Sequence, residues 1–223
     1  MQPGIQTFWD AVIALDEDLW QLRRYITFAP DNLGVYSLEL QRLIQMAAVE
    51  TEATLLWVCT NLVDPTQCHK GNRAKPFGEL LTLLAHKVES ELGVNLHNTQ
   101  VRLRRFPDPL MPFQKGVDQK TFAWWDAFTS LKHQKPQNEA KANLKHALEA
   151  FSALASMVSL TALLEEKIHR GEIFCNLEPL PKVLASLEIP GHSACVKGSG
   201  GEIWDGLPSW HLELRRHTPV SPF

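Results

Sequence analysis

Apolar residues recur at three- and four-residue steps along most of the first 170 positions, which is the pattern of amphipathic helices. Polar residues fill the opposite faces, so each helix has one side to bury. The pattern predicts five helices: four at residues 5–28, 37–62, 76–93 and 121–133, and a fifth that begins near Asn138 and keeps an apolar face as far as Ala162.

Residues typical of helix ends support these bounds. Pro30 begins a turn-forming run after the first helix. Ser37 is placed to cap the second helix, and Asn138 to cap the last one. Pro76 suits the first turn of the third helix, which we expect to stop at Gly93.

The last predicted helix has the longest apolar face, about six turns. A face of this length must be covered by other helices, because propensity alone gives an isolated helix little stability. We therefore expect a mainly α fold, an antiparallel bundle of about five helices. The apolar positions of this face are Leu144, Ala147, Leu148, Phe151, Leu154, Ala155, Val158 and Ala162.

Two regions break the helical pattern. Residues 94–120 contain three prolines in a short run and predict an extended segment with a strand at 101–105. The chain after Gly171 is rich in Pro and Gly and predicts an irregular tail, with a short helix at 182–187 and a small β-hairpin. We therefore expect a bundle over residues 1–171 and a C-terminal extension, 172–223, packed on or beside it.

Composition and charge narrow the function classes. The chain is 44% hydrophobic and 21% charged, as in ordinary globular proteins. A formal charge of -3 excludes a global basic field, so a nucleic-acid partner needs a local patch. The sequence contains no run of about 18 apolar residues, so it predicts no membrane-spanning helix. The N-terminus lacks the basic region of a signal peptide. We expect a cytoplasmic protein without membrane contact.

The four cysteines do not follow a C-x-x-C spacing. Cys68 and His69 could be two zinc ligands, but no second ligand pair stands at zinc-finger spacing. The alternative, which we prefer, is four reduced thiols, with Cys59 acting as a small apolar residue. The sequence also lacks nucleophile-elbow, His-Glu-x-x-His and Walker motifs, so no metal or cofactor is expected.

His133 is the first candidate for chemistry. It follows an aromatic helix and stands between Lys132 and Lys135. Two neighbouring cations favour the neutral imidazole, which is a general base for a ribose 2′-hydroxyl, and the lysines could neutralise a phosphate. The alternative is a histidine that only caps a helix end.

Glu50 is the second candidate, because it borders the apolar stripe of the second helix. A carboxylate there needs a partner, which Lys132, His133 or a lysine of the last helix could supply. The alternative is a surface acid whose stem packs and whose head is hydrated.

Aromatic and basic residues could bind a substrate. Trp124 and Trp125 could stack on bases, but neighbours on a helix point about 100° apart, so we expect one in the core and one partly exposed. Arg102, Arg104 and Arg105 form either a phosphate-facing rim or a solvated loop.

Several of these motifs, taken in order, resemble a group of bacterial proteins in the HEPN superfamily (higher eukaryotes and prokaryotes nucleotide-binding domain). The resemblance covers about residues 20–170 and leaves the tail outside. The matching motifs are Asp31-Asn32, Tyr36-Ser37 with Glu39-Leu40, Glu50, Trp124-Trp125, Lys132-His133 and Ala142-Asn143-Leu144.

The resemblance implies a helical bundle that often dimerises across its last helices. Active members are metal-independent endoribonucleases of toxin–antitoxin and anti-phage systems, with an Arg four to six residues before a His. Here Ala127, Phe128 and Thr129 occupy those positions before His133, and no other His has an Arg at that distance. The basic residue Lys135 follows the histidine, and Lys lacks the planar fork of Arg.

Two hypotheses follow. In the first, the chain is a HEPN-like toxin or defence protein that cuts or binds RNA, as a homodimer and with a partner protein from a neighbouring gene. His133 would be the base or acid, Lys132 and Lys135 would hold phosphate, and Asn143 and Glu50 would orient the site. In the second, the chain is a non-catalytic interaction or dimerisation module, or an adaptor whose tail docks a partner enzyme.

Overall fold

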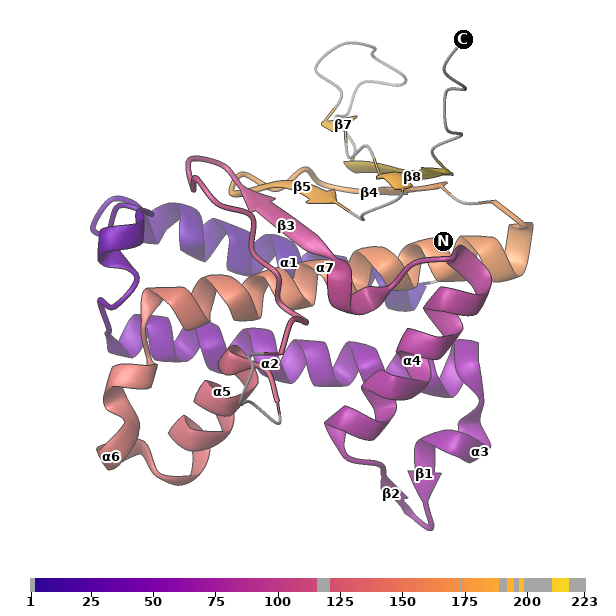
Figure 1. Ribbon diagram of the computed structural model, residues 1–223, viewed down its shortest axis with the longest axis horizontal. Helices are drawn as coiled ribbons and strands as arrows, with labels where there is room; N and C mark the ends of the chain where they lie inside the picture. Colours follow the sequence, from indigo (N-terminus) through magenta and orange to yellow (C-terminus); the bar gives the residue numbers. More distant parts are fainter. Residues whose placement is uncertain are drawn as a thin grey trace, which may run out of the picture.

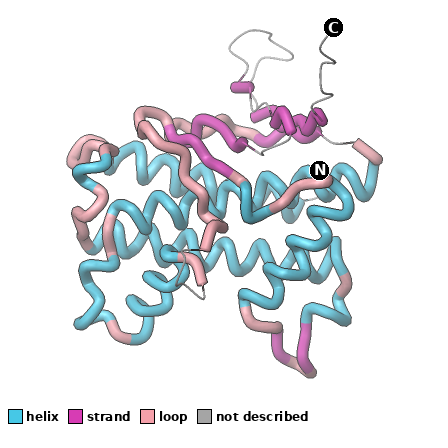
Figure 2. Tube along the Cα trace, viewed as in Figure 1, coloured by secondary structure: helices cyan, strands magenta, loops and turns pink. Residues whose placement is uncertain are grey.

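The computed structural model describes residues 3–115, 121–172, 174–188, 192–194, 197–198 and 210–216. Within them the fold is mainly α, as predicted, and most of the strands lie on one side of the helices (Figure 2). The helices are α1 Pro3–Leu22, α2 Leu38–Val58, α3 Pro65–Cys68, α4 Phe77–Leu92, α5 Ala123–His133, α6 Lys135–Asn138 and α7 Leu144–Arg170. Shorter helical turns are η1 Pro30–Asn32, η2 Cys59–Val63, η3 Leu96–Asn98 and η4 Glu139–Lys141.

Three long helices, α1, α2 and α7, form the centre of the bundle (Figure 1). The N-terminal ends of α2 and α7 are joined: the backbone N–H of Ser37 donates to Ala142 (3.1 Å), and that of Leu144 donates to Val35 (2.9 Å). These two helices therefore run in the same direction, while α1 runs antiparallel to them. The side chain of Ser37 accepts from the N–H of Leu40, which confirms the predicted cap of α2.

α7 is the core helix of the bundle. Every residue from Ala150 to Glu166 is buried, because α1, α2, α4 and α5 all pack on it. By length and composition α7 is apolar enough to cross a membrane, but 94% of its most apolar window is buried inside the protein. Its apolar character is therefore explained by helix packing.

Helix ends differ from the prediction at three places. The first helix ends at Leu22, six residues earlier than expected at residue 28. The α-helix α2 ends at Val58, four residues before the expected residue 62, and the π-helical turn η2 covers the remainder, Cys59–Val63. Asn138 does not cap the last helix, because α6 and η4 intervene and Asn143 is the cap. Gly93 ends α4 as predicted, with φ at 70° in the left-handed region that glycine tolerates.

The strands are β1 His69–Lys70, β2 Arg73–Ala74, β3 Gln100–Leu103, β4 Phe174–Leu177, β5 Leu184–Glu188, β6 His192–Ala194, β7 Lys197–Gly198 and β8 Trp210–Arg216. β3 overlaps the strand predicted at 101–105, but it begins one residue earlier and ends two residues sooner, and it pairs antiparallel with β5. β8 pairs antiparallel with β4, β6 and β7. The helix predicted at 182–187 is wrong, since most of this segment is β5.

Asp16 of α1 explains why this part of the tail is extended. Its carboxylate accepts hydrogen bonds from the backbone N–H groups of Lys182, Val183 and Leu184, the last two at 2.9 Å. These donors are then unavailable for a helical turn, and β3 provides the ladder for the residues that follow. The start of the extension is therefore attached to the bundle.

Candidate functional site

The predicted Lys-His motif lies where α5 turns into α7. We call residues 123–149, which comprise α5, α6, η4 and the first turns of α7, the α5–α7 corner. It lies on the opposite side of the bundle from β3 and β5 (Figure 1).

His133 is the last residue of α5, and its side chain is exposed. Its ring makes no hydrogen bond or ion pair within the described part of the chain. The end of α5 is closed instead by the backbone N–H of Gln134, which donates to Ser130 (2.8 Å). His133 is therefore open to solvent, as an acid–base role requires, and it does not cap the helix.

The two lysines beside His133 differ in what the structure describes. Lys132 is exposed, and its ammonium lies 5.7 Å from the centre of the Phe128 ring, a cation–π contact. Lys135 begins α6, and its side chain lies outside the described part of the structure.

Asn143 has a structural role. Its side-chain oxygen accepts from the N–H of His146 (3.0 Å), and its side-chain nitrogen donates to the carbonyl of Ala140 (3.0 Å). Both ends of the amide are therefore engaged in capping α7, and neither is directed by these bonds toward a substrate.

Trp124 does not form a base-stacking platform in this structure. It is only 1% exposed, and its indole N–H donates to the carbonyl of Pro112 (2.8 Å). Trp125 is the partly exposed member of the pair and stacks on Phe77, with ring centres 3.9 Å apart. The prediction of one buried and one partly exposed tryptophan is confirmed, but Trp124 is the buried one.

Glu50 is half-buried on α2 and makes no side-chain ion pair or hydrogen bond with the described residues. The partners expected for it, Lys132 and His133, are not within ion-pair distance. Its backbone carbonyl accepts the hydroxyl of Thr54 (2.7 Å).

The arginine cluster is separate from the α5–α7 corner. Arg102 pairs with Glu188 across β3 and β5 (2.6 Å), while Arg104 and Arg105 are exposed beside that strand pair. Arg105 has a φ of 65°, in the left-handed region. The central helices lie between this cluster and α5, so the two predicted basic groups do not form one surface (Figure 1).

The structure adds His146, which the sequence reasoning missed. It lies in the first turn of α7, half-buried, with Nδ1 2.9 Å from the carbonyl oxygen of Lys141. A nitrogen this close to a carbonyl carries the proton, so Nε2 is the acceptor of the neutral ring. Burial lowers the pKa of His146, and the charges of Lys145 and Lys141 lower it further, against the raising effect of that hydrogen bond and of Asp126.

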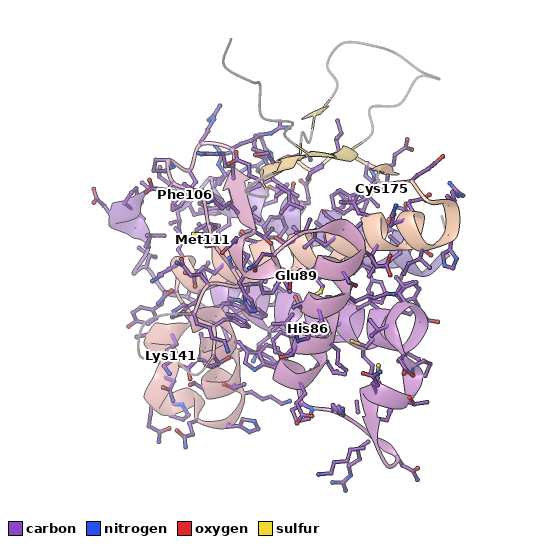
Figure 3. The ribbon with its side chains drawn as sticks, turned by 45° about the vertical axis from the view of Figure 1, so that its right-hand side comes forward. His86, Glu89, Phe106, Met111, Lys141 and Cys175 are labelled. Carbon is purple, nitrogen blue, oxygen red and sulfur yellow. The ribbon has the colours of Figure 1, made fainter. Side chains whose placement is uncertain are left out.

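Lys141 connects His146 to α5. Its ammonium lies 2.8 Å from both a carboxylate oxygen of Asp126 and the hydroxyl of Ser130. Asp126, Ser130 and His133 are spaced four and three residues apart, so they share one face of α5. Figure 3 shows Lys141 on this side of the molecule, between α5 and α7. Both histidines therefore belong to one corner.

One signal could have pointed to His146. Lys141 stands five residues before it, within the spacing that the resemblance gives for the Arg and His of active members. At that distance this sequence has a lysine in place of the arginine.

The described residues contain no group of three or more potential metal ligands. Cys59 and Cys68 are buried, free thiols, and burial raises the pKa of Cys59 to about 12, with a contribution from Cys68. Cys175 is also buried and free, near the end of α7 (Figure 3), whereas Cys195 lies outside the described residues. The zinc interpretation of Cys68 and His69 gains no third ligand within this part of the chain.

Comparison with known proteins gave no match: no family model matches the chain, and no curated protein or solved structure matches it significantly.

Proposed function

We propose that the chain is a HEPN-like RNA-directed protein of the bacterial toxin or anti-phage type, which cleaves RNA at the α5–α7 corner without a metal ion. The single observation that carries this proposal is the position of His146, whose neutral ring is oriented by Lys141 beside the α5 face that ends in His133. The HEPN-like part of the proposal is supported by the sequence motifs quoted above.

The proposed reaction is an internal phosphoryl transfer. Nε2 of His146 takes the proton of a ribose 2′-hydroxyl, and the oxygen forms a bond to the adjacent phosphorus. The bond from phosphorus to the 5′-oxygen breaks, and the leaving oxygen takes a proton from His133. The products are a 2′,3′-cyclic phosphate and a 5′-hydroxyl.

The cations of the corner support binding of the phosphate. Lys132 and Lys145 are exposed, and Lys145 has only a long contact to Glu149 (4.0 Å), whereas the ammonium of Lys141 is engaged by Asp126 and Ser130 at 2.8 Å. We therefore assign phosphate neutralisation to Lys132 and Lys145, together with Lys135 as the sequence predicts, and a positioning role to Lys141.

The test is cleavage of transfer RNA or total RNA by the full chain in the presence of a chelator. Wild type is compared with His146→Ala, His133→Ala and, as matched control, His86→Ala, an exposed histidine of α4. General acid–base catalysis contributes roughly 100- to 10,000-fold, so we expect losses of that order in the first two variants and none in the control. Equal RNA decay in wild type and both corner variants overturns the nuclease.

A non-catalytic interaction module is the second candidate. It is favoured by the hydrogen bonds of the corner, which are made within the protein. Asn143 bonds to backbone groups, and the ammonium of Lys141 bonds to the side chains of Asp126 and Ser130. In that case wild type and His146→Ala bind RNA poorly and cleave none. Stability does not separate the two cases, because removal of the hydrogen bond of His146 costs about 1–3 kcal/mol whether or not the ring is catalytic. Cleavage of RNA by the wild type separates them.

The proposed homodimer needs a surface other than α7. That helix is buried from Ala150 to Glu166 within one chain, so it has no free face over this stretch for a second copy. Light scattering at several concentrations tests the dimer directly, and co-purification with the product of a neighbouring gene tests the partner.

A further inference from the structure

A cavity of about 210 Å³ lies between the start of α4, the η3 turn and the start of α5. Its walls are formed by Phe77, Gly78, Leu81, Thr82, His97, Lys115, Thr121, Phe122 and Trp125. Of the sequence motifs, only Trp124-Trp125 contributes to this cavity, through Trp125, and the proposed RNA chemistry does not use it. We propose that this cavity is a binding site for a small planar aromatic carboxylate.

The aromatic walls favour a flat ligand. Phe77 and Trp125 are stacked at 3.9 Å, and Trp124 meets the edges of both. Behind them, Trp124 is fixed by its hydrogen bond to Pro112, and Phe122 lies edge-on to Phe113. The aromatic walls are therefore held in place by core packing, and a flat ligand would meet a preformed surface.

The size limits the ligand to about one ring system. Drug-sized ligands occupy pockets of roughly 300–1,000 Å³, which is larger than this cavity. An apolar pocket with a few convergent polar groups is the usual form of a small-molecule site.

The polar groups of the wall favour a single negative charge. Lys115 has no ion-pair partner in the described part of the chain, and no acidic residue lines the cavity there. His97 has Nδ1 3.0 Å from the carbonyl oxygen of Phe113, so Nδ1 donates to the backbone; Nε2 of the neutral ring is an acceptor and gives a carboxylate no hydrogen bond, which leaves Lys115 to bind the charge. The indole N–H of Trp125 likewise has no acceptor among the described residues. Among the described wall residues, the single positive charge of Lys115 matches the single negative charge of a carboxylate better than the two charges of a phosphate dianion.

The experiment is a ligand titration of the full chain by NMR, with benzoate as the probe. Benzamide removes the charge, cyclohexanecarboxylate removes the planarity, and uridine monophosphate represents nucleotides. The reporter is the indole N–H signal of Trp125, assigned by its loss in Trp125→Phe. A charge-assisted contact corresponds to roughly tenfold in affinity, so benzoate is expected to bind about tenfold more tightly than benzamide.

Two variants separate charge from volume. Lys115→Gln should abolish the advantage of benzoate over benzamide, while Lys70→Gln, which alters an exposed lysine outside the cavity, should leave it unchanged. Gly78→Leu should weaken both ligands, because Gly78 lines the cavity and a leucine there adds volume to the wall. The substitution should be tolerated, because a Cβ at Gly78 meets no heavy atom within 4 Å. Gly34→Leu, also in open space but outside the cavity, is its control.

Several results overturn the proposal: no response to benzoate, equal binding of benzoate and benzamide, tighter binding of uridine monophosphate, or identical behaviour of the two lysine variants. None of them bears on RNA cleavage at His146, so this site and the proposed function succeed or fail separately.

Discussion

The junction of α1 with β5 and the α5–α7 corner both use polar side chains to hold distant segments, but they differ in burial. Asp16 at the junction is 1% exposed, and its carboxylate receives three backbone N–H groups. At the corner, the side chains of Lys141 and Asp126 are 36% and 54% exposed. A buried polar contact is costly to remove, whereas an exposed one contributes little to stability and remains open to a ligand. The junction is thus built for folding and the corner is suited to chemistry.

Removing the Asp16 carboxylate should give the largest loss of stability. Burial raises the pKa of Asp16, while the three backbone donors and the charge of Arg104 oppose that rise. In Asp16→Ala the three N–H groups lose their acceptor, and we expect the free energy of unfolding to fall by roughly 3 kcal/mol. Urea denaturation measures this, and faster hydrogen exchange at Val183 and Leu184 would locate it.

The matched control is Asp18→Ala on the same helix. Asp18 is 37% exposed and pairs with Arg42, so its loss should cost at most about 1 kcal/mol. The comparison of the two regions fails if Asp16→Ala is no more harmful than Asp18→Ala.

Glu149 tests whether the corner also contains a buried charge. Burial raises its pKa to about 7, only partly opposed by Lys145, and one of its oxygens has no hydrogen-bond partner in the described structure. The folded state therefore retains the proton more strongly than the unfolded chain, whose pKa is near 4.5. The resulting stabilisation is complete below pH 4.5 and is lost as the pH rises through 7.

Glu149→Gln should remove this part of the pH dependence. At pH 8 the variant is expected to be more stable than wild type, by about 2 kcal/mol and not more than roughly 3. Thermal unfolding from pH 4 to pH 8 provides the measurement, and the exposed Glu139→Gln serves as control. His146 has the opposite effect on the pH dependence of stability, because its lowered pKa makes folding less favourable as the pH falls. Both Glu149→Gln and the wild type contain His146, so its contribution cancels when their free energies of unfolding are subtracted.

The bundle could be predicted because its causes are local. Apolar spacing located the long helices, and Ser37 and Gly93 marked real ends. The helix predicted at 182–187 failed because Asp16, more than 160 positions away, binds its backbone. No window of the sequence contains that information.

The candidate site likewise contains one histidine whose position followed from the local sequence and one whose contacts depend on the fold. The sequence pattern placed His133 at the end of an amphipathic helix but left its role as an acid–base group or a helix cap open, and the structure shows the ring exposed. The role of His146 depends on α6 and η4, which bring Lys141 to α5 and orient the ring through a backbone carbonyl. The five-residue spacing of Lys141 and His146 marks the pair in the sequence, but only the turn geometry shows these contacts.

Substitutions at Asn143 and Asn138 should have smaller effects on stability, and their difference tests whether Asn143, and not the predicted Asn138, caps α7. Asn143→Ala should lower the free energy of unfolding by about 1 kcal/mol, the usual contribution of an N-cap. Asn138→Ala, at the cap position that the sequence predicted, should cost less, because Asn138 makes a single bond to the carbonyl of Gln134. Guanidinium denaturation compares the two, and a larger loss for Asn138→Ala would contradict the observed cap.

The smallest effect is expected at the exposed edge of the junction, where Arg102 pairs with Glu188. Both side chains are more than a third exposed, at 47% and 40%, although the two atoms are only 2.6 Å apart. A double-mutant cycle with Arg102→Ala and Glu188→Ala should give a coupling of about 0.2–1 kcal/mol. The coupling should shrink as salt rises from roughly 0.1 M to 1 M, because screening shortens the range of exposed charges. A coupling energy as large as the stability loss in Asp16→Ala would mean that the short distance between the two charged atoms matters more than their burial. The difference between the two regions would then have to be explained by contact geometry.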